Sequence, residues 1–331
     1  MAVEKIKSLG RIGVLMGGAS SEREISLGSG NAVLEALKKS GVQAISIDIK
    51  TENIAENIRL LKESKIDCAF IAMHGRFGED GQLQALLDSL KIIYSGSGSL
   101  ASRLAMDKVA SRNIFQRHHL GVPRYIVLNN IDYAKYKKEI DNLALPWVIK
   151  PSTHGSSVGL SIIEKKKDLS EALNLAFNFD KTVIIEEYIP GREMTVGILD
   201  EQPLPVIEII PKKKFFDYQA KYQYGMTDYI VPAKLEEAVV LKLQSLALSA
   251  HRLLGCKGFS RADIILDTKN TPFILELNSI PGLTPTSLLP KAARAAGIEF
   301  EQLCLRLVEL AYEKAQDRFK AASVQNAGSS G

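Results

Sequence analysis

Residues 258–290 read GFSRADIILDTKNTPFILELNSIPGLTPTSLLP and carry the clearest structural signal in the chain. Two short apolar runs, Arg261–Asp267 and Phe273–Asn278, are separated by the turn-forming sequence Thr-Lys-Asn-Thr-Pro. Such a pattern predicts a β-hairpin.

The expected register of this hairpin brings four polar residues together. If the hairpin turns at Lys269–Asn270, Asp263 lies opposite Glu276. In the same register Arg261 lies opposite Asn278. Because side chains alternate between the two faces of a strand, these four residues share one face. The other face is apolar and suits a core, since it consists of Ala262, Ile264, Leu266, Phe273, Leu275 and Leu277.

The polar face of the hairpin has the composition of a metal site. Two carboxylates at ~5 Å repel each other unless a cation lies between them. Asp263 and Glu276 offer oxygen ligands and Asn278 adds a carbonyl, which favours a hard ion such as Mg²⁺ over zinc. The alternative is a solvated strand face with chance acidic residues, of which Asp267 is an example. A one-residue slip in register would scatter the cluster.

Length and composition set the broad class. The chain has 331 residues, enough for two or three domains, with 46% hydrophobic and 24% charged residues, as in soluble globular proteins. The net charge of +4 gives no argument for nucleic-acid or membrane binding. We see no export signal and no membrane-spanning run. The cysteines have no paired spacing and are expected to be buried free thiols in a reducing cytoplasm: Cys68, Cys256 and Cys304.

The first hundred residues alternate short apolar runs with helical patterns. This alternation predicts an open parallel sheet with right-handed crossovers, and Ser21–Glu24 predicts a capping box for the first helix. Ligands bind at the carboxyl ends of such strands. Three polar residues follow predicted strands and should share that edge: Glu22, His74 and Ser97. No complete dinucleotide or P-loop fingerprint occurs, which argues against a two-domain dehydrogenase.

Beyond residue 100 the pattern changes to a helix over 99–118 and short strands near 125–128, 147–150, 159–164 and 183–187. Lys150 ends one strand and precedes PSTHGSSVG, residues 151–159. Glycines flanking two serines can wrap backbone N–H groups around phosphate oxygens, although a plain Gly/Ser turn fits equally well. The sequence after Asp317 loses periodicity and is expected to be disordered.

Three further segments could contact a ligand. Glu186-Glu187-Tyr188-Ile189 ends a strand and leads past a Pro-Gly turn to Glu193, so it could offer carboxylates and backbone to an adenine and ribose, or be a charged hairpin. Phe215–Tyr229 has no regular period and many tyrosines, which suggests a lid or a swapped loop. Residues 282–287 follow the hairpin and could offer amides and a hydroxyl to a carboxylate.

Taken together and in this order, these segments resemble the D-alanine–D-alanine ligase family of the ATP-grasp superfamily. The resemblance runs from Gly17 to about Gly297. It rests on the motifs GGASSEREIS, MHGRFGEDG, SGSLASRLAMDK, KPSTHGSSVGLS, EEYIPGRE, DYQAKY, GFSRADIILD and LELNSIPGLTPTSLLP.

The resemblance implies an ATP-grasp fold, α/β overall with α+β C-terminal parts. It implies an N-terminal α/β substrate domain over 1–100, a central ATP-grasp subdomain over 101–188, and a C-terminal subdomain over 189–316 with lid loop and metal hairpin. Residues 317–331 would be the disordered tail. The implied activity is ATP-dependent synthesis of D-alanyl-D-alanine for peptidoglycan precursors, with two Mg²⁺ or Mn²⁺ ions. A homodimer is expected because the family commonly forms one.

The resemblance also implies a role for individual residues. Asp263, Glu276 and Asn278 would hold the two metal ions, with Glu276 bridging them. Glu22 would receive the ammonium of the first D-alanine, with His74 nearby, and would link with Ser156 and Tyr222 to close the lid. Arg261 and the Gly282 amide would stabilise the oxyanion, and Ser287 and Leu288 would take the second carboxylate. The ATP site would comprise Lys108, Lys150, Ser157, Glu186, Glu187, Ile189, Glu193 and Lys221.

Other functions stay open at this point. Tyr222 favours the dipeptide product, because D-lactate-using members typically carry another residue there, but D-serine or D-lactate could be the acceptor. Another ATP-grasp carboxylate–amine ligase would carry the same metal hairpin. A nucleotide-binding regulatory module that has lost catalysis is disfavoured by the intact set Glu22, Lys150, Arg261, Asp263, Glu276 and Asn278.

Overall fold

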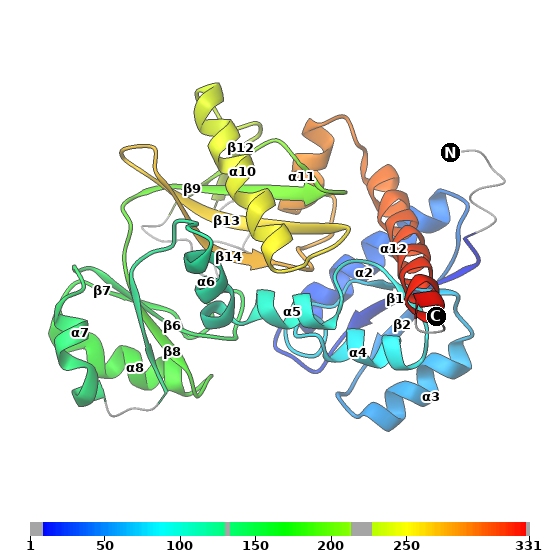
Figure 1. Ribbon diagram of the computed structural model, residues 1–331, viewed down its shortest axis with the longest axis horizontal. Helices are drawn as coiled ribbons and strands as arrows, with labels where there is room; N and C mark the ends of the chain where they lie inside the picture. The colour runs from blue at the N-terminus through cyan, green and yellow to red at the C-terminus, as the bar shows by residue number, and fades with distance from the viewer. Residues whose placement is uncertain (1–8, 130–132, 213–226, 329–331) are drawn as a thin grey trace.

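The computed structural model describes residues 9–129, 133–212 and 227–328, in which the strands form three sheets. Figure 1 shows these sheets arranged along the long axis of the molecule, with the sheet of β5–β8 at one end, the sheet of β9–β14 in the middle, and the sheet of β1–β4 at the other end. The sheet of β9–β14, called the third sheet below, therefore lies between the sheet of β1–β4 (the first) and the sheet of β5–β8 (the second).

The first sheet is open and entirely parallel, as predicted, in the order β2-β1-β3-β4. Its strands and their crossover helices alternate along the chain: β1 (Arg11–Gly17), α2 (Arg23–Lys39), β2 (Gln43–Ile49), α3 (Ile54–Ser64), β3 (Cys68–Ile71), α4 (Gln82–Ser89) and β4 (Ile93–Tyr94). The carboxyl ends of β1 and β3 lead directly to Glu22 and His74. The parallel order thus brings these two residues to one edge.

Both faces of the first sheet are covered. Ile12, Val14 and Met16 alternate along β1 and pack in one core with α2 and with α12 (Phe300–Gly328). Leu15 points the other way, into a core with α3 and α4. The C-terminal helix therefore returns to the N-terminal sheet, to which Figure 1 shows it lying adjacent.

The second sheet is antiparallel, in the order β5-β8-β6-β7. Its strands pack around Trp147 and Ile149 onto the helices that follow them in sequence. The elements are β5 (Tyr125–Leu128), η1 (Tyr133–Tyr136), α7 (Lys137–Asp141), β6 (Trp147–Pro151), β7 (Ser161–Ile163), η2 (Lys166–Asp168), α8 (Leu169–Phe177) and β8 (Val183–Glu187).

The third sheet has the order β12-β11-β9-β13-β14, with β10 paired to β9. Helices α10, α5 and α6 contribute to the core beneath it. The elements are β9 (Gly191–Leu199), β10 (Gln202–Pro203), β11 (Ile207–Pro211), β12 (Thr227–Ile230), α10 (Glu237–Leu253), β13 (Phe259–Asp267), β14 (Pro272–Asn278) and α11 (Leu288–Ala295).

The single helix predicted over 99–118 is in fact two, α5 (Ser99–Met106) and α6 (Lys108–Arg117). Asp107 has an extended backbone, and its carboxylate accepts hydrogen bonds from the N–H groups of Val109 and Ala110. An aspartate that caps a new helix in this way ends the preceding one. The break fixes Lys108 at the first position of α6.

The predicted register of the β13–β14 hairpin is confirmed where the polar residues lie: Asp263 pairs with Glu276, and Arg261 with Asn278. Beyond Asp263 the register shifts, because Ile264 pairs with Ile274 and leaves Leu275 as an extra residue. The core assignment of Phe273 and Leu275 is therefore wrong. Ile274 is buried in their place, and Leu275 is only partly buried.

Two other predictions are wrong. Glu22 occupies the N-cap position of α2 and makes no side-chain capping bond, so the capping box does not form. Helix α12 continues to Gly328, whereas disorder was expected after Asp317. Its first turns are anchored by buried residues such as Leu303 and Leu307, and a helix already nucleated extends through alanine, lysine and glutamine at little cost.

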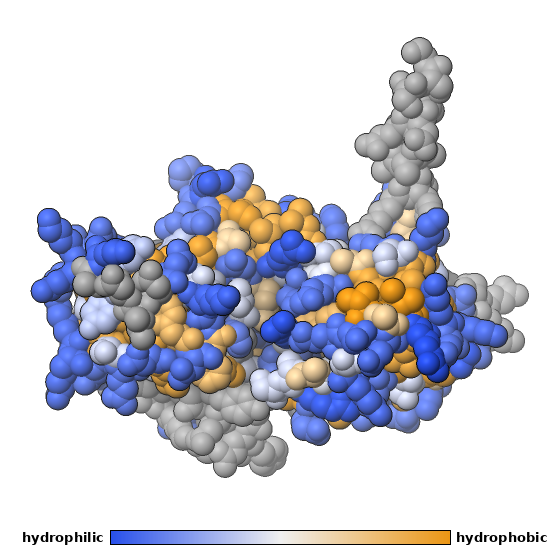
Figure 2. Space-filling model, turned by 90° about the horizontal axis from the view of Figure 1, so that it is seen from below, coloured by the Kyte–Doolittle hydropathy of each residue, from blue (hydrophilic) through white to orange (hydrophobic). Residues whose placement is uncertain are grey.

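Figure 2 shows a surface that is mostly hydrophilic, with apolar residues gathered in separate patches. Among the described residues, the exposed large apolar side chains lie on different elements: Ile54, Leu100, Leu145, Leu175, Phe179, Ile210 and Leu241. The three cysteines are buried free thiols, as predicted. Within the described part of the chain, no helix combines the length and apolarity needed to cross a lipid bilayer.

Candidate active site

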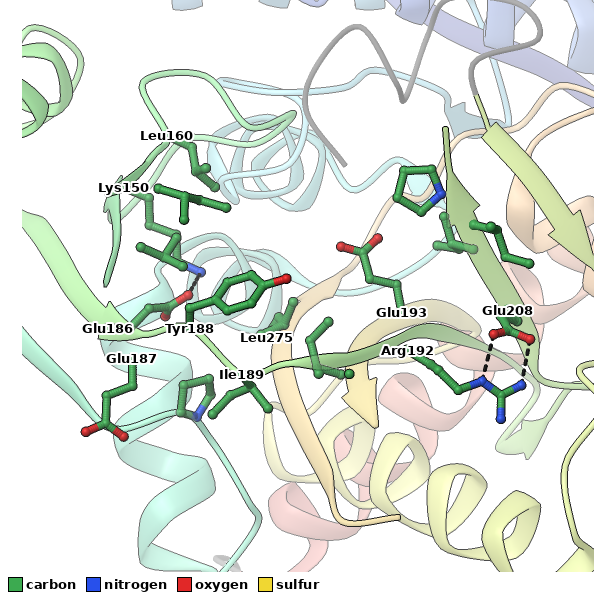
Figure 3. A pocket seen from close by; sticks show the side chains of 18 residues that line it. Lys150, Leu160, Glu186, Glu187, Tyr188, Ile189, Arg192, Glu193, Glu208 and Leu275 are labelled. Carbon is green, nitrogen blue, oxygen red and sulfur yellow. Dashed lines mark hydrogen bonds and ion pairs between the residues drawn. The ribbon is translucent and has the colours of Figure 1, made fainter. Parts of the chain in front are cut away.

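A cleft of about 520 Å³ lies between the second and third sheets. Its walls are apolar and come from both sheets: Val148, Leu160 and Ile162 on one side, and Ile209, Ile265 and Leu275 on the other. Figure 3 shows Lys150 meeting Glu186 in one part of the cleft and Arg192 meeting Glu208 in another. An apolar slot with polar groups at its ends suits a planar aromatic ring with polar substituents.

Three buried charges lie beside this cleft. The Lys150 ammonium donates to Glu186 at 2.8 Å, and the other carboxylate oxygen of Glu186 pairs with Arg112. Burial lowers the pKa of Lys150 to about 8, opposed by Glu186 and reinforced by Arg112 and Lys108. Burial disfavours the charged form of Glu186, but the two cations outweigh it and lower its pKa. Glu186 is thus ionised and engaged by both cations.

The other residues expected at the adenine and ribose also line the cleft. Glu187, Ile189 and Glu193 all contribute to its wall. The Glu187 carboxylate accepts from the Ala144 N–H at 2.9 Å and lies 3.1 Å from Arg124. It therefore fixes the loop before β6, and Figure 3 shows it directed away from Lys150.

The cleft continues into a smaller cavity lined by Lys108, Lys150 and Ser157 together with Asp263 and Glu276. The Lys108 ammonium donates to the His154 carbonyl at 2.8 Å and lies 3.2 Å from Glu276. The Gly/Ser loop (residues 151–159) therefore lines this cavity, and its role in binding phosphate stays a prediction.

Two residues of that loop have a strained backbone. Ser156 and Ser157 have φ of 54° and 59°, in the left-handed region that non-glycine residues rarely adopt. Strain of this kind persists where the surroundings impose it, and it gathers at ligand sites.

The hairpin carboxylates each face a cation of the chain. Arg261 donates two hydrogen bonds to Asp263, at 2.8 and 2.7 Å, and Lys108 faces Glu276. Asn278 donates to Asp263 at 3.2 Å. Within the described residues no group of three or more His, Cys, Asp or Glu forms a metal site. Two carboxylates and an amide nevertheless fit Mg²⁺, which usually takes few protein ligands and completes its shell with phosphate oxygens and water.

A second chamber, of about 340 Å³, lies where the first and third sheets meet the Gly/Ser loop. The Glu22 carboxylate accepts a hydrogen bond from the Ser156 hydroxyl there. His74 is buried, with Nδ1 3.1 Å from the Ile280 carbonyl and Nε2 2.9 Å from the Ser29 hydroxyl. Glu79 lies 3.7 Å from the same imidazole.

The carboxylates around His74 control its charge. Burial lowers the pKa of the imidazole, but hydrogen bonding and charge from Glu79, with the charge of Glu22, raise it above the ordinary value. The chamber thus combines two carboxylates with a histidine that can be protonated, a setting that suits an ammonium or a transferable proton.

The far wall of the chamber comes from the segment after β14. Gly282, Ser287 and Leu288 line it together with Arg261. The Ser287 hydroxyl accepts from the Thr284 N–H at 3.1 Å, which shapes the turn before α11. Leu288 begins α11, so the positive end of that helix faces the chamber.

Ser97, predicted at the same sheet edge, lines none of the three cavities, and its hydroxyl accepts a hydrogen bond from the Lys257 N–H at 3.2 Å. Every other predicted site residue within the described part of the chain lines one of these cavities. They are Glu22, His74, Lys108, Lys150, Ser156, Ser157, Glu186, Glu187, Ile189, Glu193, Arg261, Asp263, Glu276, Asn278, Gly282, Ser287 and Leu288. Lys221 and Tyr222, with most of the expected lid, lie outside the described residues.

Sequence reasoning missed several residues beside the cavities, among them Glu79, Arg112 and Leu275. Glu79 stood inside the quoted motif MHGRFGEDG, four residues after Gly75, whose N–H it accepts at 2.8 Å. Arg112 gave no such signal, since a helical arginine is usually solvated.

Two antiparallel sheets that face each other across such a cleft, beside a pair of hairpin carboxylates, define a ligase of the ATP-grasp class. The family models for D-ala D-ala ligase N-terminus and C-terminus match residues 51–97 and 114–309. The chain belongs to the D-alanine–D-alanine ligase family.

Individual relatives agree over nearly the whole length. The D-alanine–D-alanine ligase of Pelotomaculum thermopropionicum is 46% identical over 312 residues, covering 92% of this chain and 97% of the relative. The crystal structure of the Bacillus anthracis D-alanine–D-alanine ligase complexed with ATP has a TM-score of 0.81 at 33% identity, covering 93% and 99%. That of the VanG D-Ala:D-Ser ligase from Enterococcus faecalis has a TM-score of 0.78 at 30% identity, covering 91% and 99%.

Proposed function

We propose that this chain joins two D-alanine molecules into D-alanyl-D-alanine and converts ATP to ADP and phosphate. One observation carries the proposal beyond family membership: Glu276 lines both the phosphate-end cavity and the second chamber. A nucleotide whose base lies in the large cleft would extend its phosphates toward this carboxylate. A carboxylate substrate in the chamber would approach it from the other side.

In the first step, the γ-phosphoryl group passes to a carboxylate oxygen of the first D-alanine, which gives D-alanyl phosphate and ADP. Lys108 and Lys150 would hold the phosphates by charge, and the loop around Ser157 would supply backbone N–H groups. Asp263, Glu276 and Asn278 would hold Mg²⁺ or Mn²⁺, which when bound neutralises charge on the phosphate oxygens.

In the second step, the unprotonated amine of the second D-alanine attacks the carbonyl carbon. A C–N bond forms, the bond to phosphate breaks, and the nitrogen loses a proton. Arg261 and the Gly282 N–H would oppose the charge that develops on the carbonyl oxygen. Asp263 already fixes the Arg261 guanidinium at the edge of the chamber through two hydrogen bonds.

The two amino acids would be held by different walls. Glu22, beside His74, would receive the ammonium of the first D-alanine. Ser287 and Leu288 at the start of α11 would receive the carboxylate of the second. Tyr222 and Lys221 would complete the site from the lid, with Tyr222 joining Ser156 and Glu22, and Lys221 reaching the transferred phosphate.

The reaction is tested by incubating the protein with ATP, Mg²⁺ and a panel of D- and L-amino acids and D-lactate. Phosphate release and product mass are measured together. We expect D-alanine-dependent phosphate release and a product with the mass of the dipeptide. Phosphate release with no dependence on D-alanine would sink the proposal.

A second acceptor has a specific observation in its favour, because the similar VanG protein is named a D-Ala:D-Ser ligase. Competition between D-alanine, D-serine and D-lactate for one limiting D-alanyl phosphate decides between them. We expect the mass of D-alanyl-D-alanine to dominate.

We also propose that the protein acts as a homodimer in the cytoplasm, where ATP is available, and that its domains divide near residues 100 and 188. Light scattering during gel filtration tests the dimer, with a monomer mass at micromolar concentration as the contrary result. Limited proteolysis tests the domain limits, since linkers are cut before packed domains.

A further inference from the structure

Arg112 is a fully buried arginine that borders the nucleotide cleft. Arginine is almost never completely buried unless it is paired, because an unpaired charge loses its hydration. The contacts that compensate Arg112 come from two different sheets. Arg112 therefore connects the second sheet with the third.

The first contact is with the second sheet. Arg112 forms an ion pair with the Glu186 carboxylate, whose other oxygen accepts from Lys150 at 2.8 Å. The guanidinium also lies 5.3 Å from the centre of the Tyr125 ring. One buried carboxylate is therefore shared between two cations.

The second contact is with the third sheet. Arg112 Nη2 donates to the Leu275 carbonyl at 3.2 Å. Leu275 is the extra residue of the β14 bulge, it immediately precedes Glu276, and its side chain lines both parts of the nucleotide cleft. Arg112 thus joins the two walls at the point where the cleft passes into the phosphate-end cavity.

The charges have a consequence for Lys150. With Glu186 alone, Lys150 would form a neutral pair and present little net charge to a ligand. With Arg112 present, the group of three carries one net positive charge. Because ATP phosphates are negatively charged, this net positive charge strengthens their attraction to the Lys150 ammonium.

We propose that Arg112 is a positioning residue for ATP binding: it compensates Glu186, so that the Lys150 ammonium stays available to the phosphates, and it holds the Leu275 peptide at the junction of the two sheets. The inference rests on the proposed function, because it takes Lys150 to be a ligand of ATP. Arg112 itself does not touch the reacting atoms.

The test measures the affinity for ATP with Mg²⁺ by titration calorimetry in the absence of D-alanine, with melting temperatures recorded in parallel. We expect Arg112→Met to weaken ATP binding by roughly 10- to 100-fold, the size of one charged contact. Arg112→Lys keeps the charge and should recover most of this loss. The KM for D-alanine should change far less than the KM for ATP.

A double variant distinguishes compensation of the Glu186 charge from a purely structural role of Arg112 through its hydrogen bond to Leu275. In Arg112→Met/Glu186→Gln the uncompensated carboxylate is gone, so it no longer neutralises the Lys150 ammonium. The net positive charge beside the cleft is restored, and at neutral pH ATP should bind more tightly than to Arg112→Met. If the double variant binds ATP no better than Arg112→Met, the proposal is wrong. The proposal would also be refuted if folded Arg112→Lys bound ATP as weakly as folded Arg112→Met.

A matched control is Arg306→Met. Arg306 pairs with Asp200, Glu309 and Glu313 away from the three cavities, so this variant should lower the melting temperature without changing ATP affinity. A comparable loss of ATP affinity in this control would refute a specific role for Arg112. Because ATP binding is measured without D-alanine, this result and the ligase assay can fail independently.

Discussion

Glu22, at the start of α2, accepts a hydrogen bond from Ser156 in the Gly/Ser loop, although 134 residues separate them in sequence. This bond joins the second chamber to the Gly/Ser loop, which lines the cavity of Lys108 and Lys150. Under the proposed function, it would connect recognition of the amino acid with closure of the nucleotide site.

Replacing Ser156 tests that connection. We expect Ser156→Ala and Ser156→Gly to lower kcat by roughly 10- to 100-fold, since each removes one charge-assisted hydrogen bond. Glycine also relieves the positive φ, so Ser156→Gly should be more stable than Ser156→Ala by about 1 kcal/mol. Steady-state kinetics and thermal unfolding measure the two effects separately. Full activity in both variants would contradict a role for the hydroxyl.

Replacing Glu276 tests the metal ligands. We expect Glu276→Gln to abolish turnover with the fold retained, because one carboxylate is lost where the two cavities meet. Circular dichroism checks that the fold is retained, and ATPase activity measured over a range of Mg²⁺ concentrations checks that turnover is lost. Near-normal turnover would refute the metal role.

Asp267 provides the control on the same hairpin. Its carboxylate accepts from the N–H groups of Lys269 and Thr271 at 2.8 and 2.7 Å, and these bonds lower its pKa. It therefore shapes the turn, so Asp267→Asn should reduce stability slightly and leave kcat unchanged.

The pH dependence of ATP use should reflect Lys150, whose pKa is lowered to about 8 chiefly by burial. The ammonium is present below this pH and is lost as the pH rises through it. We therefore expect kcat/KM for ATP to fall about tenfold per pH unit above pH ~8. Lys150→Arg, which stays charged, should remove this alkaline decline while retaining some activity. An unchanged decline in that variant would assign it to another group.

Two glycines of α2 provide a stability test. A Cβ at Gly30 would lie 2.4 Å from Met16 Cβ in the first sheet, whereas a Cβ at Gly28 would meet nothing within 4 Å. We expect Gly30→Ala to destabilise the protein by ~2 kcal/mol through overpacking. Gly28→Ala should stabilise it by up to ~1 kcal/mol through helix propensity. Denaturant unfolding measures both, and equal stability of the two variants would contradict the packing described here.

The register of a strand pair could be predicted from the sequence only where polar and apolar residues alternate along the strand. Asp263 and Glu276 were paired correctly because polar and apolar residues alternate from Arg261 to Ile264 and because the turn residues between the two runs set the register. The bulge was missed because Phe273, Ile274 and Leu275 are all apolar, so the sequence does not indicate which of them faces the core. The motifs likewise named residues that line the three cavities, although these residues range from loop positions such as Ser156 to strand positions such as Asp263. Their roles in catalysis and binding stay predictions.

Other features depended on contacts distant in sequence. The capping box failed because α2 begins at Arg23, so Glu22 rather than Ser21 occupies the N-cap position. The Glu22 carboxylate instead accepts from Ser156, a partner that no local pattern reveals. Arg112 was overlooked for the same reason, since both of its partners lie far along the chain. The break at Asp107 had a local signal, an aspartate able to cap α6, that competed with a continuous helical pattern.

The packing of α12 against the first sheet and α2 has a consequence for synthesis on the ribosome. The face of the first sheet that carries Ile12 and Val14 shares a core with Leu303 and Leu307. Nearly 300 residues must therefore be translated before that core can be completed, and part of the sheet stays open to chaperones or to aggregation meanwhile. Ribosome-bound chains arrested before α12 should accordingly be more sensitive to protease in residues 11–94 than chains arrested after it.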